Sequence, residues 1–332
     1  MAAPTRRRKS GQISGENIVI EAAWMYYHDG LNQTEIAVQL GVSRATVVNY
    51  LQEAKKQGLI RISLAPGAFT THRLALEIKQ RFNLIAAFIV PDGTGGDEER
   101  LMRVARGAAE WLPDLLAPGD RLGVSWGRTV FEVAEALEQS QTKDVTVSQL
   151  VGSMATPYGF TAEICSAHMA QRLGAQCINL HAPAVLSDPD LAARLRAEPI
   201  IRDQIDALSH CNKAIFAAGS CNHESHIVGS GVASHGDLDW YVANGATGVL
   251  CGRFIDRAGQ PLPGDLDERM IGVELDKLLG LEMGLLVSDG PDKVVPMLSA
   301  IAGGYVTHVV TSAATANRML AASQDQSLST FP

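Results

Sequence analysis

The stretch Gln33–Leu51, QTEIAVQLGVSRATVVNYL, decides how the first part of the chain folds. Its apolar residues recur at helical spacing on both sides of Gly41, a residue whose backbone freedom suits a tight turn. Ser43 stands where the N-cap of a second helix is expected. The pattern therefore predicts two short helices joined by a tight turn. The residues expected on their inward faces are Ile36, Ala37, Leu40, Val47, Tyr50 and Leu51.

The second helix is expected to turn a hydrogen-bonding surface outward. Arg44 and Asn49 are the best candidates for contacts to base edges in a major groove, with Ala45 packing against a base edge. Thr46 and Lys55 are better suited to phosphates. An ordinary helical hairpin is the alternative, but several fixed positions match a DNA reader together. The predicted DNA-binding residues are Ser43, Arg44, Ala45, Thr46, Asn49, Lys55 and Arg61.

The flanking sequence extends this motif to a helix-turn-helix domain over residues 16–64. A supporting helix is expected over Glu16–His28, and residues 59–63 read as a short strand of a small wing in which Arg61 could reach a phosphate. Residues 1–15 are predicted to be a disordered basic arm. The composition changes at Ala65-Pro66-Gly67, and residues 65–71 are predicted to be a linker.

Charge is divided unevenly along the chain. Its 332 residues have a formal net charge of −8, which is unexpected for a DNA binder. Residues 1–64, however, hold eight Lys/Arg and five Asp/Glu, a net charge of +3, so the remainder carries −11. A basic N-terminal region on an otherwise acidic chain would be attracted to the phosphates of DNA through that region. This asymmetry supports the DNA-binding interpretation, which rests on the helix-turn-helix motif.

Composition favours a globular protein whose cysteines are reduced. Hydrophobic residues make up 46% of the chain and charged residues 19%, and no apolar run approaches the length of a transmembrane helix. A signal peptide requires a hydrophobic segment after its basic residues, and none follows the N-terminal basic residues here. Five scattered cysteines favour free thiols, and we expect a cytoplasmic location and no membrane partner.

Beyond the linker, strand-like and helix-like segments alternate over residues 72–322, followed by a polar tail over 323–332. This alternation predicts an α/β domain with a mostly parallel sheet covered on both faces, in which ligands bind past the carboxyl ends of strands. The expected strands are Ala86–Val90, Arg121–Val124, Val145–Leu150, Gln176–Leu180, Lys213–Ala218, Gly248–Arg253, Gly284–Val287 and Thr307–Thr311. The expected helices are His72–Phe82, Asp97–Leu116, Thr129–Gln139, Thr161–Leu173, Asp190–Ala197, Ile200–Ser209, Leu238–Asn244, Lys293–Ala302 and Ala314–Ala321.

The most distinctive loop of this domain is GVSWGRT at Gly123–Thr129, between a predicted strand and a predicted helix. Backbone N–H groups at a helix N-terminus, two hydroxyls and Arg128 are the components of an anion or phosphate site. The loop lacks the Gly-Lys-Ser/Thr ending of a Walker loop and the G-x-S-x-G frame of a nucleophile elbow. A purely structural turn is the alternative. The predicted effector-binding residues in this loop are Ser125, Trp126, Gly127, Arg128 and Thr129.

Two further segments are predicted to complete this site. Gln149, Gly152 and Ser153 follow another strand and could supply a second polar wall. Lys293 opens a helix, where a cation is unfavourably placed with respect to the helix dipole. An anionic ligand would explain its position, although so would plain exposure to solvent.

Taken together, the motifs resemble those of SorC-type (SorC/DeoR) transcriptional regulators over nearly the whole chain beyond residue 16. The resemblance implies a tetrameric repressor or activator, without a cofactor, whose α/β domain is related to sugar-phosphate isomerase and CoA-transferase-like folds. It further implies that a phosphorylated sugar or polyol changes the protein's affinity for operator DNA of a carbohydrate or sugar-alcohol catabolic operon. The matching stretches are AAWMYYHDGLNQTEIAVQLGVSRATVVNYLQEAKKQGLIRI in the first domain and, in the second, GVSWGRT, QLVGS, HAPA at His181–Ala184, GATGVLCGRFIDRAG at Gly245–Gly259 and KVVPMLSAIAGGYVTHVVTSAATANRML at Lys293–Leu320.

The chain departs from that family's pattern at two places. Val249 stands where members usually carry Asp, and Ser312 and Ala313 stand where they usually carry Asp and Glu. Carboxylates there would accept hydrogen bonds from sugar hydroxyls. Their loss implies a less hydroxylated effector or a pocket rebuilt by other residues.

The sequence also suggests three alternatives to this function: a zinc site, an enzyme and an effector-independent oligomer. Cys211, Cys221, His223, His226 and His235 suggest zinc, but their spacing matches no compact metal pattern, so no metal site is predicted, and His223 or His226 could instead line the effector pocket. An enzyme acting on sugar phosphates is disfavoured because the candidate loops hold no convincing acid–base pair. The third is a DNA-binding oligomer that responds to no effector.

Overall fold

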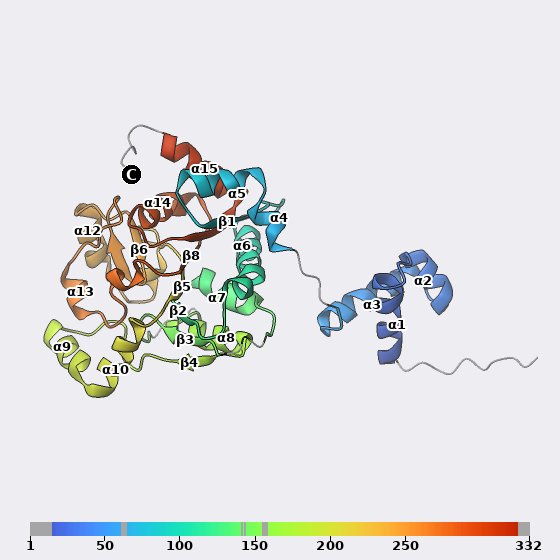
Figure 1. The fold of residues 1–332 in the computed structure, drawn as a ribbon, viewed down its shortest axis with the longest axis horizontal. Coiled ribbons are helices and arrows are strands. Elements are labelled where there is room, and N and C mark those ends of the chain that lie inside the picture. The colour runs from blue at the N-terminus through green and yellow to red at the C-terminus, as the bar shows by residue number, and fades with distance from the viewer. Residues whose placement is uncertain (1–14, 61–64, 141, 143, 155–158, 325–332) are drawn as a thin grey trace, which may run out of the picture. The chain divides into compact units, whose positions relative to one another are not determined.

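The computed structural model describes residues 15–60, 65–140, 142, 144–154 and 159–324 (Figure 1). The chain divides into two compact units, Met1–Leu64 and Ala65–Pro332. The predicted basic arm, Arg61 with most of the predicted wing, and nearly all of the polar tail lie outside the described residues. Residues 59 and 60, which are described, do not form a strand.

The first unit consists of helices α1 (Gly15–Tyr27), α2 (Gln33–Leu40) and α3 (Arg44–Lys56). Asn32 and Glu35 form a capping box at the start of α2, in which Asn32 Oδ1 accepts from the Glu35 N–H at 3.1 Å and the Glu35 carboxylate accepts from the Asn32 N–H at 2.8 Å. Gly41 ends α2 in the left-handed conformation, with φ of 66°. The predicted helix pair and its turn are therefore confirmed.

A small apolar core holds these helices together. Four of the six residues expected on the inward faces are buried, and Leu40 and Tyr50 are partly buried. Helix α1 contributes residues to the same core and to a neighbouring cluster around Ala54 of α3. The buried residues of the unit are Val19, Ala22, Ala23, Ile36, Ala37, Val47, Leu51 and Ala54.

The second unit is built on a seven-stranded sheet whose neighbouring strands are all parallel, in the order β1-β9-β8-β5-β2-β3-β4. The predicted parallel sheet is confirmed. Its strands are β1 (Ala86–Val90), β2 (Arg121–Val124), β3 (Thr146–Gln149), β4 (Gln176–Ile178), β5 (Lys213–Phe216), β8 (Met283–Val287) and β9 (His308–Ser312).

Helices cover both faces of this sheet (Figure 1). One face packs against α6 (Asp97–Trp111), α7 (Arg128–Ala136) and α8 (Ala162–Leu173). The other packs against α5 (Arg73–Arg81), α12 (His235–Ala243), α14 (Val294–Ala302) and α15 (Ala313–Gln324). Side chains alternate between the faces, so strand β1 sends Ala87 and Ile89 to one cluster and Phe88 and Val90 to the other. Besides α4, which is described below, the other helices are α9 (Pro189–Ala197), α10 (Pro199–Leu208), α11 (His226–Gly229), α13 (Asp265–Arg269), η1 (Leu112–Leu115), η2 (Leu275–Leu278) and η3 (Pro291–Lys293).

The strand order reverses direction between β2 and β5. From β2 the chain builds outward through β3 to the edge strand β4. It then returns to β5 on the other side of β2 and builds through β8 to β9. Loops that leave β2 and β5 at their carboxyl ends therefore diverge, which opens a crevice of the kind in which α/β proteins bind ligands.

Two expectations from the sequence were wrong in detail. The expected linker, 65–71, contains helix α4 (Pro66–Thr70), whose Phe69 ring stacks on Phe88 of the sheet at 4.9 Å between centroids. The expected strand Gly248–Arg253 is instead a hairpin of β6 (Gly248–Leu250) and β7 (Arg253–Ile255), because Cys251 and Gly252 adopt φ of 49° and 85° and turn the chain.

Candidate functional site

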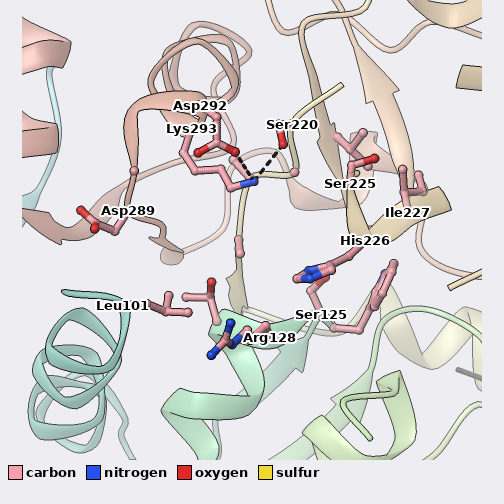
Figure 2. Close-up of a pocket in the computed structure, with 18 of the residues that line it drawn as sticks. Leu101, Ser125, Arg128, Ser220, Ser225, His226, Ile227, Asp289, Asp292 and Lys293 are labelled. Carbon is pink, nitrogen blue, oxygen red and sulfur yellow. Dashed lines mark hydrogen bonds and ion pairs between the residues drawn. The ribbon is translucent and has the colours of Figure 1, made fainter. Parts of the chain in front are cut away.

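A cavity of about 480 Å³ lies at the carboxyl ends of β2, β5 and β8, where the strand order reverses. The loops after these three strands supply much of its lining. The start of α6, the start of α11 and the β6–β7 hairpin supply the rest. Figure 2 shows Arg128 and Ser125 on one side of the cavity and Lys293 with Ser220 on the other.

The loop after β2 presents the N-terminus of α7 to this cavity. Gly127 precedes the helix with φ of 117°, and no side chain caps the helix there. The first N–H groups of a helix have no partners within it, so they can donate to a ligand. Arg128 also lines the cavity and is held by Glu98 at 2.6 Å and by Glu132 at 4.0 Å. Because the first of these pairs is exposed, a bound anion could displace it at small cost.

The loop after β8 presents Lys293 to the opposite side. Its Nζ donates to Ser220 Oγ at 2.9 Å and pairs with Asp292 at 2.9 Å (Figure 2). Burial acts to raise the pKa of Asp292, but the hydrogen bond and charge of Lys293 outweigh it, and the pKa lies below its usual value. Asp292 is thus held ionised beside the lysine, and this end of the cavity offers both donors and an acceptor.

A buried network fixes the wall between these two ends. Asp289 lines the cavity and pairs with Arg100 at 3.4 Å, while the Thr315 hydroxyl donates to its carboxylate at 2.7 Å. Ser312 in turn accepts from the Thr315 N–H at 3.2 Å. The hydroxyl at 312 therefore supports Asp289 from behind and does not line the cavity itself.

Six of the nine predicted effector-binding residues line the cavity together: Ser125, Trp126, Gly127, Arg128, Thr129 and Lys293. The other three do not, and their prediction was wrong as to position. Gln149 is fully buried, donates to the Val151 carbonyl at 2.7 Å and accepts from the Leu180 N–H at 3.3 Å. Gly152 lies so close to Ala184 that a Cβ would clash, and Ser153 donates its N–H to Ala182. These residues join β3 to the segment after β4.

Several cavity residues were missed in the sequence. Ser220 and Ser225 follow β5, and Arg100 and Asp289 come from α6 and the β8 loop. A strand was expected at β5, so the rule that ligands bind past carboxyl ends could have identified Ser220. Of the two histidines named as candidates for the pocket, His226 lines the cavity. His223 does not, and it pairs with Asp239 at 3.0 Å.

Val249 occupies the cavity wall beside the end of β5. Its N–H and carbonyl exchange hydrogen bonds with Gly219 at 3.0 and 2.9 Å, so these backbone groups are already paired. A Cβ at Gly219 would lie 3.1 Å from the Val249 Cβ. This wall is therefore apolar and closely packed, whereas Ala313 starts α15 and does not line the cavity.

The cysteines and histidines considered for zinc do not gather. Among the described residues, no three His, Cys, Asp or Glu side chains are grouped as metal ligands would be. Cys211 is buried before β5, and His223 stacks on His235 with ring centroids 5.2 Å apart. Burial raises the pKa of Cys221 to about 12, since the opposing charge of Lys293 is the weaker influence.

The first unit presents the predicted DNA-binding face on α3. Ser43 caps this helix by accepting from the Thr46 N–H at 3.0 Å, and its Oγ also lies 2.8 Å from Thr46 Oγ1. Arg44 and Asn49 are exposed, and Arg44 Nε donates to Gln33 Oε1 at 3.2 Å. Ala45 and Lys55 are exposed as well, and Thr46 is partly buried. The exposed positions form an outward polar face on a helix whose opposite face is buried.

Comparison with known proteins places the chain in a class. A family model described as "Putative sugar-binding domain" matches residues 67–321. The chain is 38% identical over 321 residues to "Uncharacterized transcriptional regulator YjhU" of Escherichia coli K12, covering 95% of this chain and 98% of that protein. It is 29% identical over 316 residues to the transcriptional regulator LsrR of Enterobacter sp. strain 638, covering 93% and 94%.

A solved structure shows the same fold. The full-length sorbitol operon regulator SorC from Klebsiella pneumoniae matches with a TM-score of 0.76 and 24% identity, covering 92% of this chain and 99% of that one. The protein is thus classed as a transcriptional regulator and not as an enzyme. The chain belongs to the SorC-type transcriptional regulators with a C-terminal sugar-binding domain, and the resemblance found in the sequence is confirmed. The expected relation to isomerase and CoA-transferase-like folds stays a prediction.

None of the helices in the described part of the chain combines the length and apolar character that crossing a bilayer requires.

Proposed function

We propose that this regulator binds operator DNA of a carbohydrate or sugar-alcohol catabolic operon and that a phosphorylated sugar or polyol in the cavity changes its affinity for that DNA. The observation that carries the proposal is the cavity at the strand reversal, where the uncapped N-terminus of α7, Arg128 and Lys293 face one space. A helix N-terminus and two cationic side chains suit a phosphate. Asp289, Asp292 and Ser220 offer partners for hydroxyl groups.

The DNA half of the proposal rests on α3. Its exposed Arg44 and Asn49 can reach base edges in a major groove, with Ala45 against a base. Lys55 and Arg61 contact phosphates in this proposal, and so does Thr46 once the helix lies in the groove. Ser43 holds the first turn through its cap and contributes indirectly.

Paired heads would read two operator half-sites, which requires an oligomer, and we propose a homotetramer. Sedimentation equilibrium of the full chain tests this part of the proposal. A dimer at the concentrations at which the protein binds its operator would overturn the homotetramer, and a monomer would also overturn the paired reading of two half-sites.

The function is tested with the full-length protein and DNA from the promoter of the operon it controls. Sugar and polyol phosphates and their unphosphorylated counterparts are screened by thermal shift, and the stabilising compounds are then added to an operator-binding titration. We expect at least one phosphorylated compound, and not its unphosphorylated counterpart, to raise the unfolding midpoint and to shift the operator Kd. Operator binding that no stabilising compound changes would instead describe an effector-independent oligomer.

A further inference from the structure

His226 lies at the start of α11, on the part of the cavity wall that faces both cationic groups. Figure 2 shows its imidazole pointing into the space between Lys293 on one side and Arg128 on the other, beside Ser125. Its ring packs against Phe160, with centroids 5.0 Å apart. The side chain is exposed and lines the cavity, so a molecule bound there can contact part of the ring.

The charged groups around His226 come from three elements. Arg128 belongs to α7 and Lys293 to the loop after β8. The carboxylates nearest these cations are already engaged, since Glu98 of α6 holds Arg128 at 2.6 Å and Asp292 holds Lys293 at 2.9 Å. Burial lowers the pKa of His226 most, and the positive charges of Lys293 and Arg128 lower it further. When no ligand is present, burial and the two nearby cations therefore disfavour the protonated imidazole.

An anion in this space would reverse the balance of charge around the ring. A phosphate placed between Arg128 and Lys293 would favour the imidazolium and would gain a charge-assisted hydrogen bond from it. Ser225 lines the same cavity at 8% exposure, and its buried Oγ has no hydrogen-bond partner among the described residues. A bound oxyanion or hydroxyl could supply one.

We propose that His226 is a further ligand of the effector's anionic group, beside Arg128, Lys293 and the N-terminus of α7, and that it takes up one proton from solvent when the anion binds. The proposal rests on the proposed function, because it assigns the phosphate of that effector to this part of the cavity. Binding is then stronger at lower pH, since the protonated form of the site is the one that holds the anion.

Sulfate is the probe, because it stays a dianion from pH 6 to 8.5 and contributes no titration of its own. Sulfate binding to the full-length protein is measured by the rise of the unfolding midpoint and by calorimetry in two buffers of different ionisation enthalpy. Above the free-state pKa of His226, the Kd should rise by up to about tenfold per pH unit, with close to one proton taken up per sulfate. His226→Gln should bind sulfate more weakly, with a Kd that does not change over this range.

His223→Gln is the matched control, because His223 lies three residues away, pairs with Asp239 and does not line the cavity. This variant should keep the pH dependence of the wild type. Sulfate binding that is independent of pH, or a pH dependence that survives in His226→Gln, would overturn the proposal and leave the proposed function standing. If sulfate does not bind at all, the anion site is absent, and the operator titration with phosphorylated compounds then decides the proposed function separately.

Discussion

Arg44 sits at the first position of α3, exposed and held by Gln33 at 3.2 Å. Arginine contacts to guanine discriminate between bases by about 1–3 kcal/mol, which corresponds to roughly 5- to 150-fold in affinity. Arg44→Ala should therefore weaken operator binding by roughly this factor at each half-site and leave binding to non-specific DNA nearly unchanged. The measurement is a pair of anisotropy titrations with operator and scrambled DNA. Wild-type discrimination in the variant would contradict the assignment of α3 as the recognition helix, and unchanged thermal stabilisation by effector serves as the control.

Lys293 offers a second test at the scale of one side chain. Lys293→Ala should weaken the effector response of operator binding by at least about tenfold, since a charge-assisted contact is worth about 1.5–3 kcal/mol. Operator affinity without effector should stay unchanged. Lys277→Ala is a suitable control, because Lys277 also pairs with the preceding residue, Asp276, at 3.1 Å but lies outside the cavity lining. An unchanged dose response in Lys293→Ala would remove Lys293 from the site.

At the scale of elements, Gly127 determines how α7 enters the cavity. Its φ of 117° and ψ of 166° are accessible almost only to glycine, although a Cβ there would meet no atom within 4 Å. Gly127→Ala should thus cost about 1–3 kcal/mol through backbone strain alone. Thermal unfolding should show a lower midpoint, and sulfate stabilisation should fall because the first N–H groups of α7 shift. A variant as stable as the wild type would show that another conformation is tolerated there.

Strands β2 and β5, which flank the reversal of strand order, are joined at their other end by a buried ion pair. Asp120, just before β2, contacts Lys213 Nζ at 2.6 Å, and Lys213 also donates to the Leu115 carbonyl at 2.6 Å. Lys213→Met would leave Asp120 buried without its partner and should cost about 3–5 kcal/mol, measured by urea unfolding. Asp120→Leu combined with Lys213→Met should recover most of that loss. If the double variant is no more stable than the single variant, the loss comes from removing the ion pair and not from the unpaired charge of Asp120.

The same pair gives a pH dependence with a definite sign. Burial acts to raise the pKa of Asp120, but the hydrogen bond and charge of Lys213 lower it below its usual value. A carboxyl whose folded-state pKa is depressed contributes stability above its unfolded pKa of about 3.9 and loses it as pH falls through the folded value. The wild type should therefore lose stability relative to the double variant, which lacks this carboxyl, as the pH falls below about 4.

On the scale of the whole molecule, the proposed function assigns DNA recognition to the first unit and effector binding to the second. The acidic charge lies in the second unit, so only contacts made by the first should produce a salt dependence. The logarithm of operator affinity should fall steeply with the logarithm of salt concentration, with a slope near −0.9 per phosphate contact. Lys55→Ala should reduce that slope by about one without changing sequence preference. A slope that remains unchanged would show that Lys55 makes no phosphate contact.

Sequence reasoning reached the local features and missed those that depend on distant residues. The cap at Ser43, the turn at Gly41 and the apolar strands β1 and β2 follow from neighbours in the chain, and all agree with the structure. Gln149 was misassigned because a polar residue after a strand can face either a ligand or a buried carbonyl, and its partner Leu180 lies 31 residues away. Helix α4 was not predicted because its Pro-Gly sequence suggests a linker. Its Phe69 packs on Phe88 of the sheet, a contact between residues that neighbouring sequence does not reveal.

The contact between Gly219 and Val249 has a consequence for how this site can change during evolution. The two positions belong to different elements and their backbones are paired, so the space between them is shared, and a larger side chain fits at one of them only if the other stays small. Among homologues, residue identity at these positions should covary: where 219 gains a side chain, 249 should be smaller, and a bulky or charged residue at 249 should be found only opposite glycine. Ligand preference can then diverge through this pair of sites while the buried strands that specify the fold stay unaltered.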